Sequence, residues 1–178
     1  MRFTTRKMAV AAIVGAAYAA LTMALAPISY GPIQMRVSEV LCILPFFLPC
    51  TTWGLFVGCA IANLISAAGI WDVIFGSLAT LGACLCIQML GQQGRAASSW
   101  PRVILAALMP VIWNAVIIGA MLMWMLTDAV FPHFTFTFFV FAGEVALGEL
   151  VVMFVLGIPL LKLLDRSGWF RAVAQSAC

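Results

Sequence analysis

The sequence predicts an all-α membrane protein, with six transmembrane helices in one compact bundle and both termini in the cytoplasm. Three observations lead to this fold class. Of the 178 residues, 65% are hydrophobic and only 8% are charged, against about 25% charged residues in an ordinary soluble domain. The apolar residues form runs long enough to cross a membrane, which takes about 20 helical residues. The basic residues are grouped in a few places, and such groups mark cytoplasmic segments.

The first apolar run extends from Met8 to Ala26, after three basic residues within the first seven positions. It is longer than the apolar core of a usual signal peptide, so we expect a retained first helix with a cytoplasmic N-terminus. Small residues recur in this run at four-residue spacing, which lets another helix approach closely. They serve either internal packing or the docking of another protein, and they are Ala12, Gly15, Ala16, Ala19 and Ala20.

The second apolar run, Val40–Ile70, is too long for one span. As a single helix it would measure about 46 Å, whereas the hydrocarbon core of a bilayer is about 30 Å thick. It also contains Pro45 and Pro49, and proline interrupts the hydrogen-bond ladder of a helix. We therefore expect a break near Pro49, with a short helix before it and a full helix after it.

The basic residues test this division. Arg95 and Arg102 mark one later loop as cytoplasmic, and Lys162, Arg166 and Arg171 mark the C-terminal segment. Two cytoplasmic points are separated by an even number of spans, so the second run has to count as two. We expect a single membrane domain over residues 1–178, with helices at about 8–26, 38–49, 51–69, 73–91, 103–127 and 138–162.

The polar residues inside these helices are concentrated in the predicted outer half of the bundle. Glu144 and Glu149 lie well within the last helix, where a carboxylate costs about 2.5–3.5 kcal/mol unless it faces a cavity or a partner. Five residues apart, the two side chains are about 140° apart around the helix. A polar cavity open to the outside explains this distribution, and its candidate binding residues are Gln34, Arg36, Glu39, Asn63, Asp72, Asn114, Glu144 and Glu149.

Simpler interpretations of the same residues remain open. Arg36 and Glu39 are three residues apart and would form a local ion pair at a helix start. Asn63 and Asn114 would hydrogen-bond between neighbouring helices, and the two glutamates would do the same in a protonated form.

Several classes of function are disfavoured. The chain has no G-x-x-x-x-G-K-[ST] loop, so it cannot hydrolyse ATP by a P-loop mechanism. It has no basic patch for nucleic acid. No catalytic spacing of His, Ser and Asp is present, and we expect no enzyme activity, no metal site and no cofactor.

Several segments resemble the queuosine-precursor transporter (QueT) family, over about nine-tenths of the chain. The first is Tyr30-Gly31-Pro32-Ile33-Gln34-Met35-Arg36-Val37-Ser38-Glu39, whose Gln-x-Arg-x-Ser-Glu run is the most specific part. The others are Leu44-Pro45-Phe46, residues 58–64, residues 72–81, residues 146–150 and residues 156–160. The resemblance implies the substrate-binding (S) component of an energy-coupling factor (ECF) transporter. Such a component works with a membrane coupling (T) protein and two cytoplasmic ATPases, and the small-residue face of the first helix is similar to the family's docking surface.

The resemblance also implies a ligand, a 7-deazaguanine such as preQ1, preQ0 or queuine. Glu149 or Glu144 would accept the N–H groups of its guanine-like edge. Asp72 or Glu39 would meet the aminomethyl cation of preQ1, and Arg36 would orient Glu39. The main alternative is a stand-alone secondary transporter of a small heterocycle, with Glu144 or Glu149 as proton relay. An intramembrane enzyme and a purely structural subunit are further alternatives.

Overall fold

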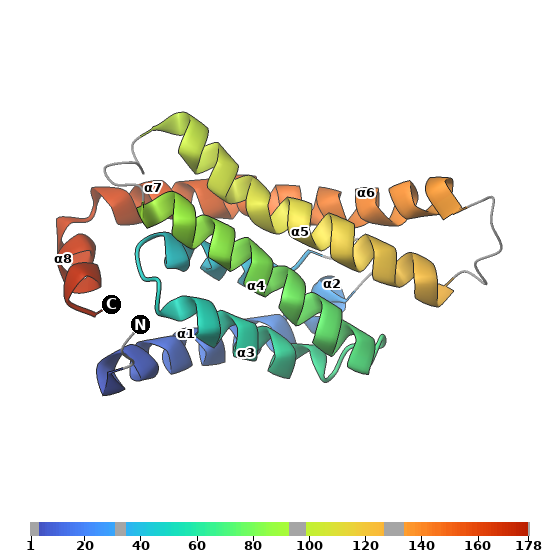
Figure 1. Ribbon diagram of the computed structural model, residues 1–178, viewed down its shortest axis with the longest axis horizontal. Coiled ribbons are helices and arrows are strands. Elements are labelled where there is room, and N and C mark those ends of the chain that lie inside the picture. Colours follow the sequence, from blue (N-terminus) through green and yellow to red (C-terminus); the bar gives the residue numbers. More distant parts are fainter. Residues whose placement is uncertain (1–3, 31–34, 93–98, 127–133, 178) are drawn as a thin grey trace.

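The computed structural model describes residues 4–30, 35–92, 99–126 and 134–177, and every regular element within these ranges is a helix. Here η1 is a 3-10 helix and η2 is a π-helical segment. The prediction of an all-α protein is confirmed for these ranges. In chain order the elements are α1 (Thr5–Ala24), α2 (Ala26–Ser29), η1 (Val37–Phe46), α3 (Thr51–Asn63), α4 (Ile70–Gln92), α5 (Trp100–Leu126), α6 (Phe134–Val152), η2 (Met153–Gly157), α7 (Ile158–Arg166) and α8 (Gly168–Ala177) (Figure 1).

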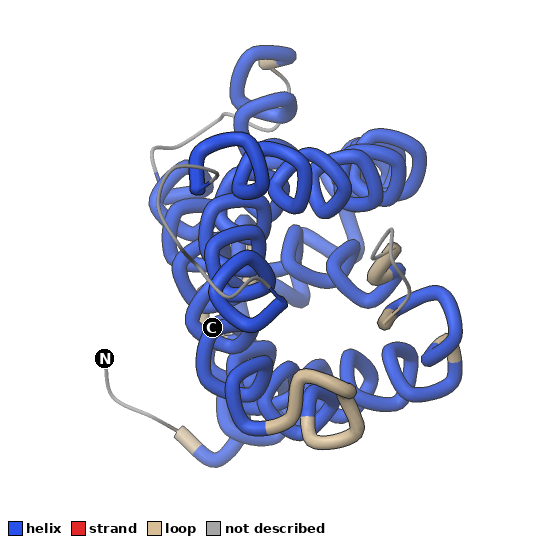
Figure 2. The backbone as a smooth tube through the Cα atoms, turned by 90° about the vertical axis from the view of Figure 1, so that its right-hand side faces the viewer, coloured by secondary structure: helices blue, strands red, loops and turns tan. Residues whose placement is uncertain are grey.

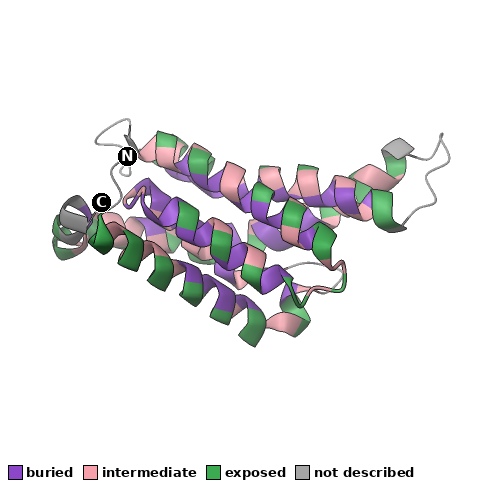
Figure 3. Cartoon of the chain, turned by 60° about the horizontal axis from the view of Figure 1, so that its bottom comes forward, coloured by how far each residue is buried: buried purple, intermediate pink, exposed green. Residues whose placement is uncertain are grey.

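Four of the described helical segments are long and apolar enough to cross a membrane. Large apolar side chains point outward from the bundle, as Ile13 and Leu163 do with about two-thirds of their surface exposed, and the outward faces carry most of the exposed residues (Figure 3). A lipid environment accommodates such a surface, because the helices satisfy their own backbone hydrogen bonds. The protein is therefore a multi-pass membrane protein, with candidate spans Thr5–Ala24, Ile70–Gly91, Trp100–Met125 and Phe136–Arg166.

The structure divides the second apolar run into η1 and α3, separated by residues 47–50. The ten residues of η1 rise about 2 Å each as a 3-10 helix, and the thirteen residues of α3 rise about 1.5 Å each, so both are only about 20 Å long. The 3-10 form of η1 differs from the α-helix that the sequence suggested. Likewise, α3 ends at Asn63 instead of continuing to residue 69, because residues 64–69 form turns and Gly69 has a φ of 59°.

The core of the bundle forms around η1. This short helix contacts α1, α3, α4, α5, α6 and α7, and Figure 2 shows the bundle with its long helices viewed end-on. Its residues Cys42 and Ile43 are fully buried and belong to the same core cluster as Tyr18, Leu55 and Met153. The polar residues that flank and belong to η1 are therefore held deep inside the protein.

Glycines bring α1 and α3 into close contact. A Cβ atom added to Gly54 would lie 1.9 Å from the carbonyl oxygen of Ala11, and one added to Gly15 would lie 2.3 Å from the carbonyl oxygen of Gly54. Neither position has room for a side chain. Small residues at this spacing are typical of helices that associate by packing in a membrane. At the end of the bundle where α1 begins, α8 contacts α1, and Ala174 packs with Leu48.

Candidate functional site

Six buried polar side chains from six segments form what we call the polar cluster. Each is at most 2% exposed. Burying so many polar groups among membrane helices is costly unless they pair with each other or serve a function. The polar cluster consists of Arg36, before η1; Glu39, in η1; Asn63, in α3; Asp72, in α4; Asn114, in α5; and Glu149, in α6.

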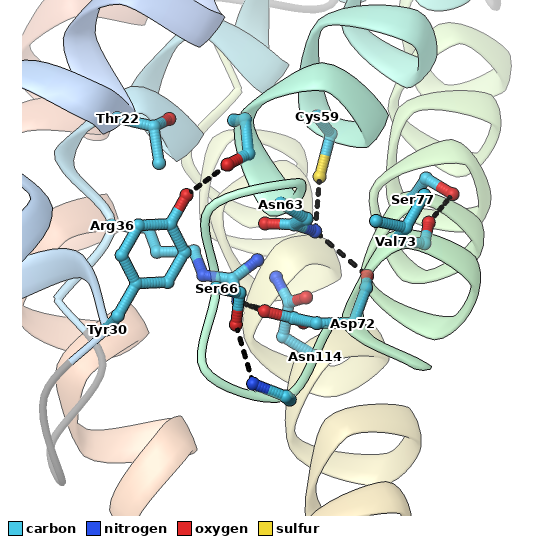
Figure 4. Close-up of polar contacts among 12 residues, drawn as sticks. Thr22, Tyr30, Arg36, Cys59, Asn63, Ser66, Asp72, Val73, Ser77 and Asn114 are labelled. Atoms are coloured by element: carbon cyan, nitrogen blue, oxygen red, sulfur yellow. Dashed lines mark hydrogen bonds and ion pairs between the residues drawn. The ribbon is translucent and has the colours of Figure 1, made fainter. Parts of the chain in front are cut away.

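Arg36 and Asp72 form an ion pair at the centre of the view in Figure 4. The Nη2 atom of Arg36 donates to both carboxylate oxygens of Asp72, at 3.1 and 3.2 Å. The guanidinium also lies over the ring of Tyr30, 5.7 Å from its centroid, and the Tyr30 hydroxyl donates to the carbonyl of Ala62 at 2.5 Å. The sequence suggested a local ion pair between Arg36 and Glu39, but Arg36 pairs with Asp72 instead. The fold brings Asp72 to Arg36 from 36 residues away.

The charges around this pair fix its protonation. Burial by itself would lower the pKa of Arg36, but the neighbouring Asp72 carboxylate outweighs this effect and raises the pKa above its usual value. Partial burial raises the pKa of the Tyr30 hydroxyl. Arg36 therefore stays charged and Tyr30 stays a hydrogen-bond donor at physiological pH.

Asn63 and Gly76 complete the surroundings of the ion pair. The Nδ2 atom of Asn63 donates to the backbone carbonyl of Asp72 at 2.9 Å and contacts the sulfur of Cys59 at 3.4 Å. A Cβ atom on Gly76 would lie 2.4 Å from that Nδ2 and 2.9 Å from the Oδ1 of Asp72. The glycine therefore gives Asn63 and Asp72 the space they need beside α4.

Glu39 is held by donors on both of its oxygens. Its Oε1 accepts from the hydroxyl of Tyr18 at 2.5 Å and from that of Thr80 at 3.2 Å, and its Oε2 accepts from the thiol of Cys42 at 3.0 Å. These bonds connect η1 to α1 and α4. The carboxylates of Glu39 and Asp72 thus both have partners within the protein, and Arg36 pairs with Asp72. The roles of Asp72 or Glu39 toward a ligand cation, and of Arg36 in orienting Glu39, stay predictions.

Glu149 and Asn114 meet across the α5–α6 contact, with few partners of their own. The Nδ2 atom of Asn114 donates to the Oε1 of Glu149 at 3.4 Å, a long hydrogen bond. The other oxygen of Glu149, the Oδ1 of Asn114 and the Oδ1 of Asn63 have no hydrogen-bond partner among the described residues. The polar cluster thus contains three buried acceptor atoms that a ligand can satisfy.

One candidate from the sequence, Glu144, does not belong to the polar cluster, and the structure does not describe another, Gln34. Glu144 lies on α6 at the edge of its buried face, which Val145, Glu149 and Val152 form, and is only half-buried. Gln34 lies outside the described residues.

The small-residue stripe of α1 is divided between two environments. Gly15 and Ala19 are buried, and Gly15 packs directly on Gly54 of α3. In contrast, Ala12, Ala16 and Ala20 are exposed. An open apolar groove of about 660 Å³ runs between α1 and α3, and its lining includes Ala12, Gly15, Ala16, Trp53 and Val57.

Sequence reasoning missed three residues that shape the site: Tyr18, Thr80 and Gly76. For Tyr18 a signal exists, because Tyr18 and Thr22 are the polar side chains of the first apolar run and share one helix face. Thr22 donates to Ser38 at 2.6 Å, beside the bond from Tyr18 to Glu39. Nothing in the sequence singles out Thr80 or Gly76.

A helical, multi-pass membrane protein with a buried polar cluster among its helices has the architecture of a membrane transport protein. Comparison with known proteins specifies the class further. The family model described as "QueT transporter" matches residues 8–166, so the chain belongs to the QueT transporter family. It is therefore not an enzyme.

A curated relative covers part of the chain. The "Queuosine precursor transporter QueT" of Lactococcus lactis subsp. cremoris (strain MG1363) is 49% identical over 72 residues. That match covers 39% of this chain and 42% of the relative, so it spans less than half the length of either protein. No solved structure matches the chain.

Proposed function

We propose that this protein is the substrate-capture (S) subunit of an ECF-type importer, and that it binds a queuosine precursor, a 7-deazaguanine such as preQ1, preQ0 or queuine. Membership of the QueT transporter family and the name of the relative from Lactococcus support a queuosine precursor as cargo. The single observation that carries the binding role is the polar cluster, with its three unpaired acceptor atoms at Asn63, Asn114 and Glu149.

The ligand would occupy the space beside these acceptors, with the Arg36–Asp72 pair and Glu39 holding the surrounding segments in place. A guanine-like ring offers several N–H groups, and buried acceptors bind such donors well because no water competes for them. Six membrane passes with both chain ends in the cytoplasm would place the polar cluster toward the outside. The short segments η1 and α3 would then count as two of the passes.

Transport would need a coupling T protein and two cytoplasmic ATPases as partners, since the chain has no P-loop of its own. The exposed alanines Ala12, Ala16 and Ala20, beside the groove between α1 and α3, supply a surface that a partner helix can approach closely. Of the other two residues that the sequence assigned to the same surface, Gly15 lines the groove while packing on Gly54 of α3, and Ala19 is buried.

Two measurements test the proposal. Isothermal titration of the purified protein in detergent against preQ1, preQ0, queuine and guanine should show binding of at least one deazaguanine in preference to guanine. Uptake of that compound by proteoliposomes should then require the T protein and the ATPases. If none of these compounds binds, the proposed cargo is wrong. If a proton gradient alone drives uptake, the protein is a secondary transporter, for which the buried Glu149 is the candidate proton carrier.

The docking surface has its own test, the substitution Ala16→Leu. A leucine in the groove should abolish uptake in the complete system and leave ligand affinity in detergent unchanged. Ala17→Leu makes the same change at the next exposed position of α1, outside the groove lining, and should preserve uptake. Equal loss with both variants would mean that the groove is not the docking surface.

A further inference from the structure

The unpaired buried atoms of Asn63, Asn114 and Glu149 share one chemical character, because all three are acceptors. The orientation of each amide follows from its partners. The amide nitrogen of Asn63 faces a backbone carbonyl and that of Asn114 faces a carboxyl oxygen, and both of these partners accept hydrogen bonds. Reversing either amide would set two acceptors against each other. The amide oxygens are therefore the atoms left for a ligand.

The charges of the polar cluster favour the same kind of ligand. Arg36 is already matched by Asp72. The unpaired oxygens of Asn63, Asn114 and Glu149 carry partial negative charge. A ligand acceptor placed against them would be repelled, whereas N–H groups would be attracted.

We infer that the polar cluster selects its ligand by an edge that carries only donors, a ring N–H beside an exocyclic amine, and that Glu149 is the residue that sets this selectivity. This inference rests on the proposed function and specifies which hydrogen bonds recognise the ligand. A carboxylate offers two acceptor oxygens side by side, which match the two adjacent N–H groups of a 2-amino-6-oxo ring. The same ring without its 2-amino group keeps the ring N–H and replaces the second donor by a C–H, so one oxygen of Glu149 would stay unpaired.

The substitution Glu149→Gln should change which edge is preferred. A glutamine amide has one acceptor and one donor, so it matches a ring N–H beside a carbonyl, and its NH2 group opposes the 2-amino group. The variant should therefore lose affinity for the 2-amino ligand and gain relative affinity for the ligand that lacks this group. Glu144→Gln is the matched control, because Glu144 is on the same helix and is not on its buried face.

The experiment uses preQ0 and its 2-deamino analogue, which differ only in the exocyclic amine. Their dissociation constants are measured by titration calorimetry for the wild type, Glu149→Gln and Glu144→Gln in detergent. We expect the wild type to prefer preQ0 by at least about tenfold. We expect the ratio to fall to about one or below in Glu149→Gln and to stay at the wild-type value in Glu144→Gln.

The outcomes separate the two claims. If the wild type binds neither compound nor any other deazaguanine, the proposed function fails. If the wild type binds both compounds equally, the proposed function stands, but the inference that the ligand is selected by its donor-only edge is wrong. This result is obtained without any variant. Glu149 does not set the selectivity if Glu149→Gln weakens the binding of both compounds by the same factor. The same conclusion follows if Glu144→Gln is the variant that changes the ratio of the two dissociation constants.

Discussion

The ion pair between Arg36 and Asp72 gives the sharpest stability prediction. Both side chains are only 2% exposed, and the Nη2 atom of Arg36 lies 3.1 Å from an oxygen of Asp72. Asp72→Leu leaves the guanidinium buried without this partner, and Arg36→Met leaves the carboxylate in the same condition. Removing one member of a buried pair typically costs about 3–5 kcal/mol. The Glu39 carboxylate also attracts the Arg36 guanidinium and would remain in Asp72→Leu. We therefore expect the loss of unfolding free energy in this variant to lie near the lower end of that range, at about 3 kcal/mol.

The double variant Arg36→Met/Asp72→Leu should recover most of this loss. Replacing both members of a buried pair by apolar groups of similar volume is often neutral, since no charge then remains unpaired. For a chain of this length a loss of about 3 kcal/mol corresponds to a fall of roughly 6–12 °C in the unfolding midpoint. The double variant should lie within a few degrees of the wild type, so the two substitutions should be strongly non-additive.

Thermal unfolding in detergent, followed by tryptophan fluorescence, measures all four proteins of this cycle. The reasoning is refuted if Asp72→Leu lowers the midpoint by less than about 2 °C, equivalent to less than about 1 kcal/mol. It is also refuted if the double variant loses the sum of the two single losses. Either result would mean that the pair is solvated or that Arg36 is satisfied equally well elsewhere.

Two further predictions concern packing and a single hydrogen bond. Gly54→Ala would force a methyl group against the backbone of Ala11 and should cost about 1–3 kcal/mol in unfolding free energy. Gly143→Ala, whose added Cβ meets nothing within 4 Å, should leave the midpoint unchanged or raise it, because alanine favours a helix more than glycine does. Equal effects would contradict the close α1–α3 approach. Tyr30→Phe removes the bond to Ala62 and keeps the ring beneath the guanidinium, so it should cost only about 0.5–1.5 kcal/mol. Since partial burial raises the pKa of Tyr30, the stabilising contribution of its hydroxyl should be fully present below pH 10.0, the ordinary tyrosine value. It should then decline as the pH rises from there through the raised pKa. In difference absorbance titrations the phenolate missing from Tyr30→Phe should therefore appear above pH 10.0, and a transition at or below that value would show that the hydroxyl is not buried as described.

Much of the site was predictable because burying polar residues in a membrane protein is costly. Asn63, Asn114 and Glu149 were chosen from the sequence as polar residues within apolar runs, and all three are buried. Glu144 satisfied the same criterion and is only half-buried, because depth along a helix does not determine which way a side chain points.

The partners of these residues were not predictable. The sequence favours pairs close along the chain, such as Arg36 with Glu39, whereas Arg36 pairs with Asp72 and Glu39 binds Tyr18 and Thr80. Each of these contacts depends on the rotation and depth of two different helices. The importance of Gly76 depends on the same geometry, because a glycine is required only where another segment approaches its backbone.

By itself, the amino-acid sequence determined the membrane class, the helical fold, the family and most of the residues that would be buried despite their polarity. These properties follow from composition and from the cost of moving each residue type out of water, and both are local to the chain. Only the tertiary structure decided which of those residues neutralise each other and which keep unpaired acceptors. It also decided that Gly15 faces α3 while Ala12 and Ala16 remain exposed. The physical reason is that hydrogen bonds and close packing act over a few ångströms, so they depend on how separate helices meet.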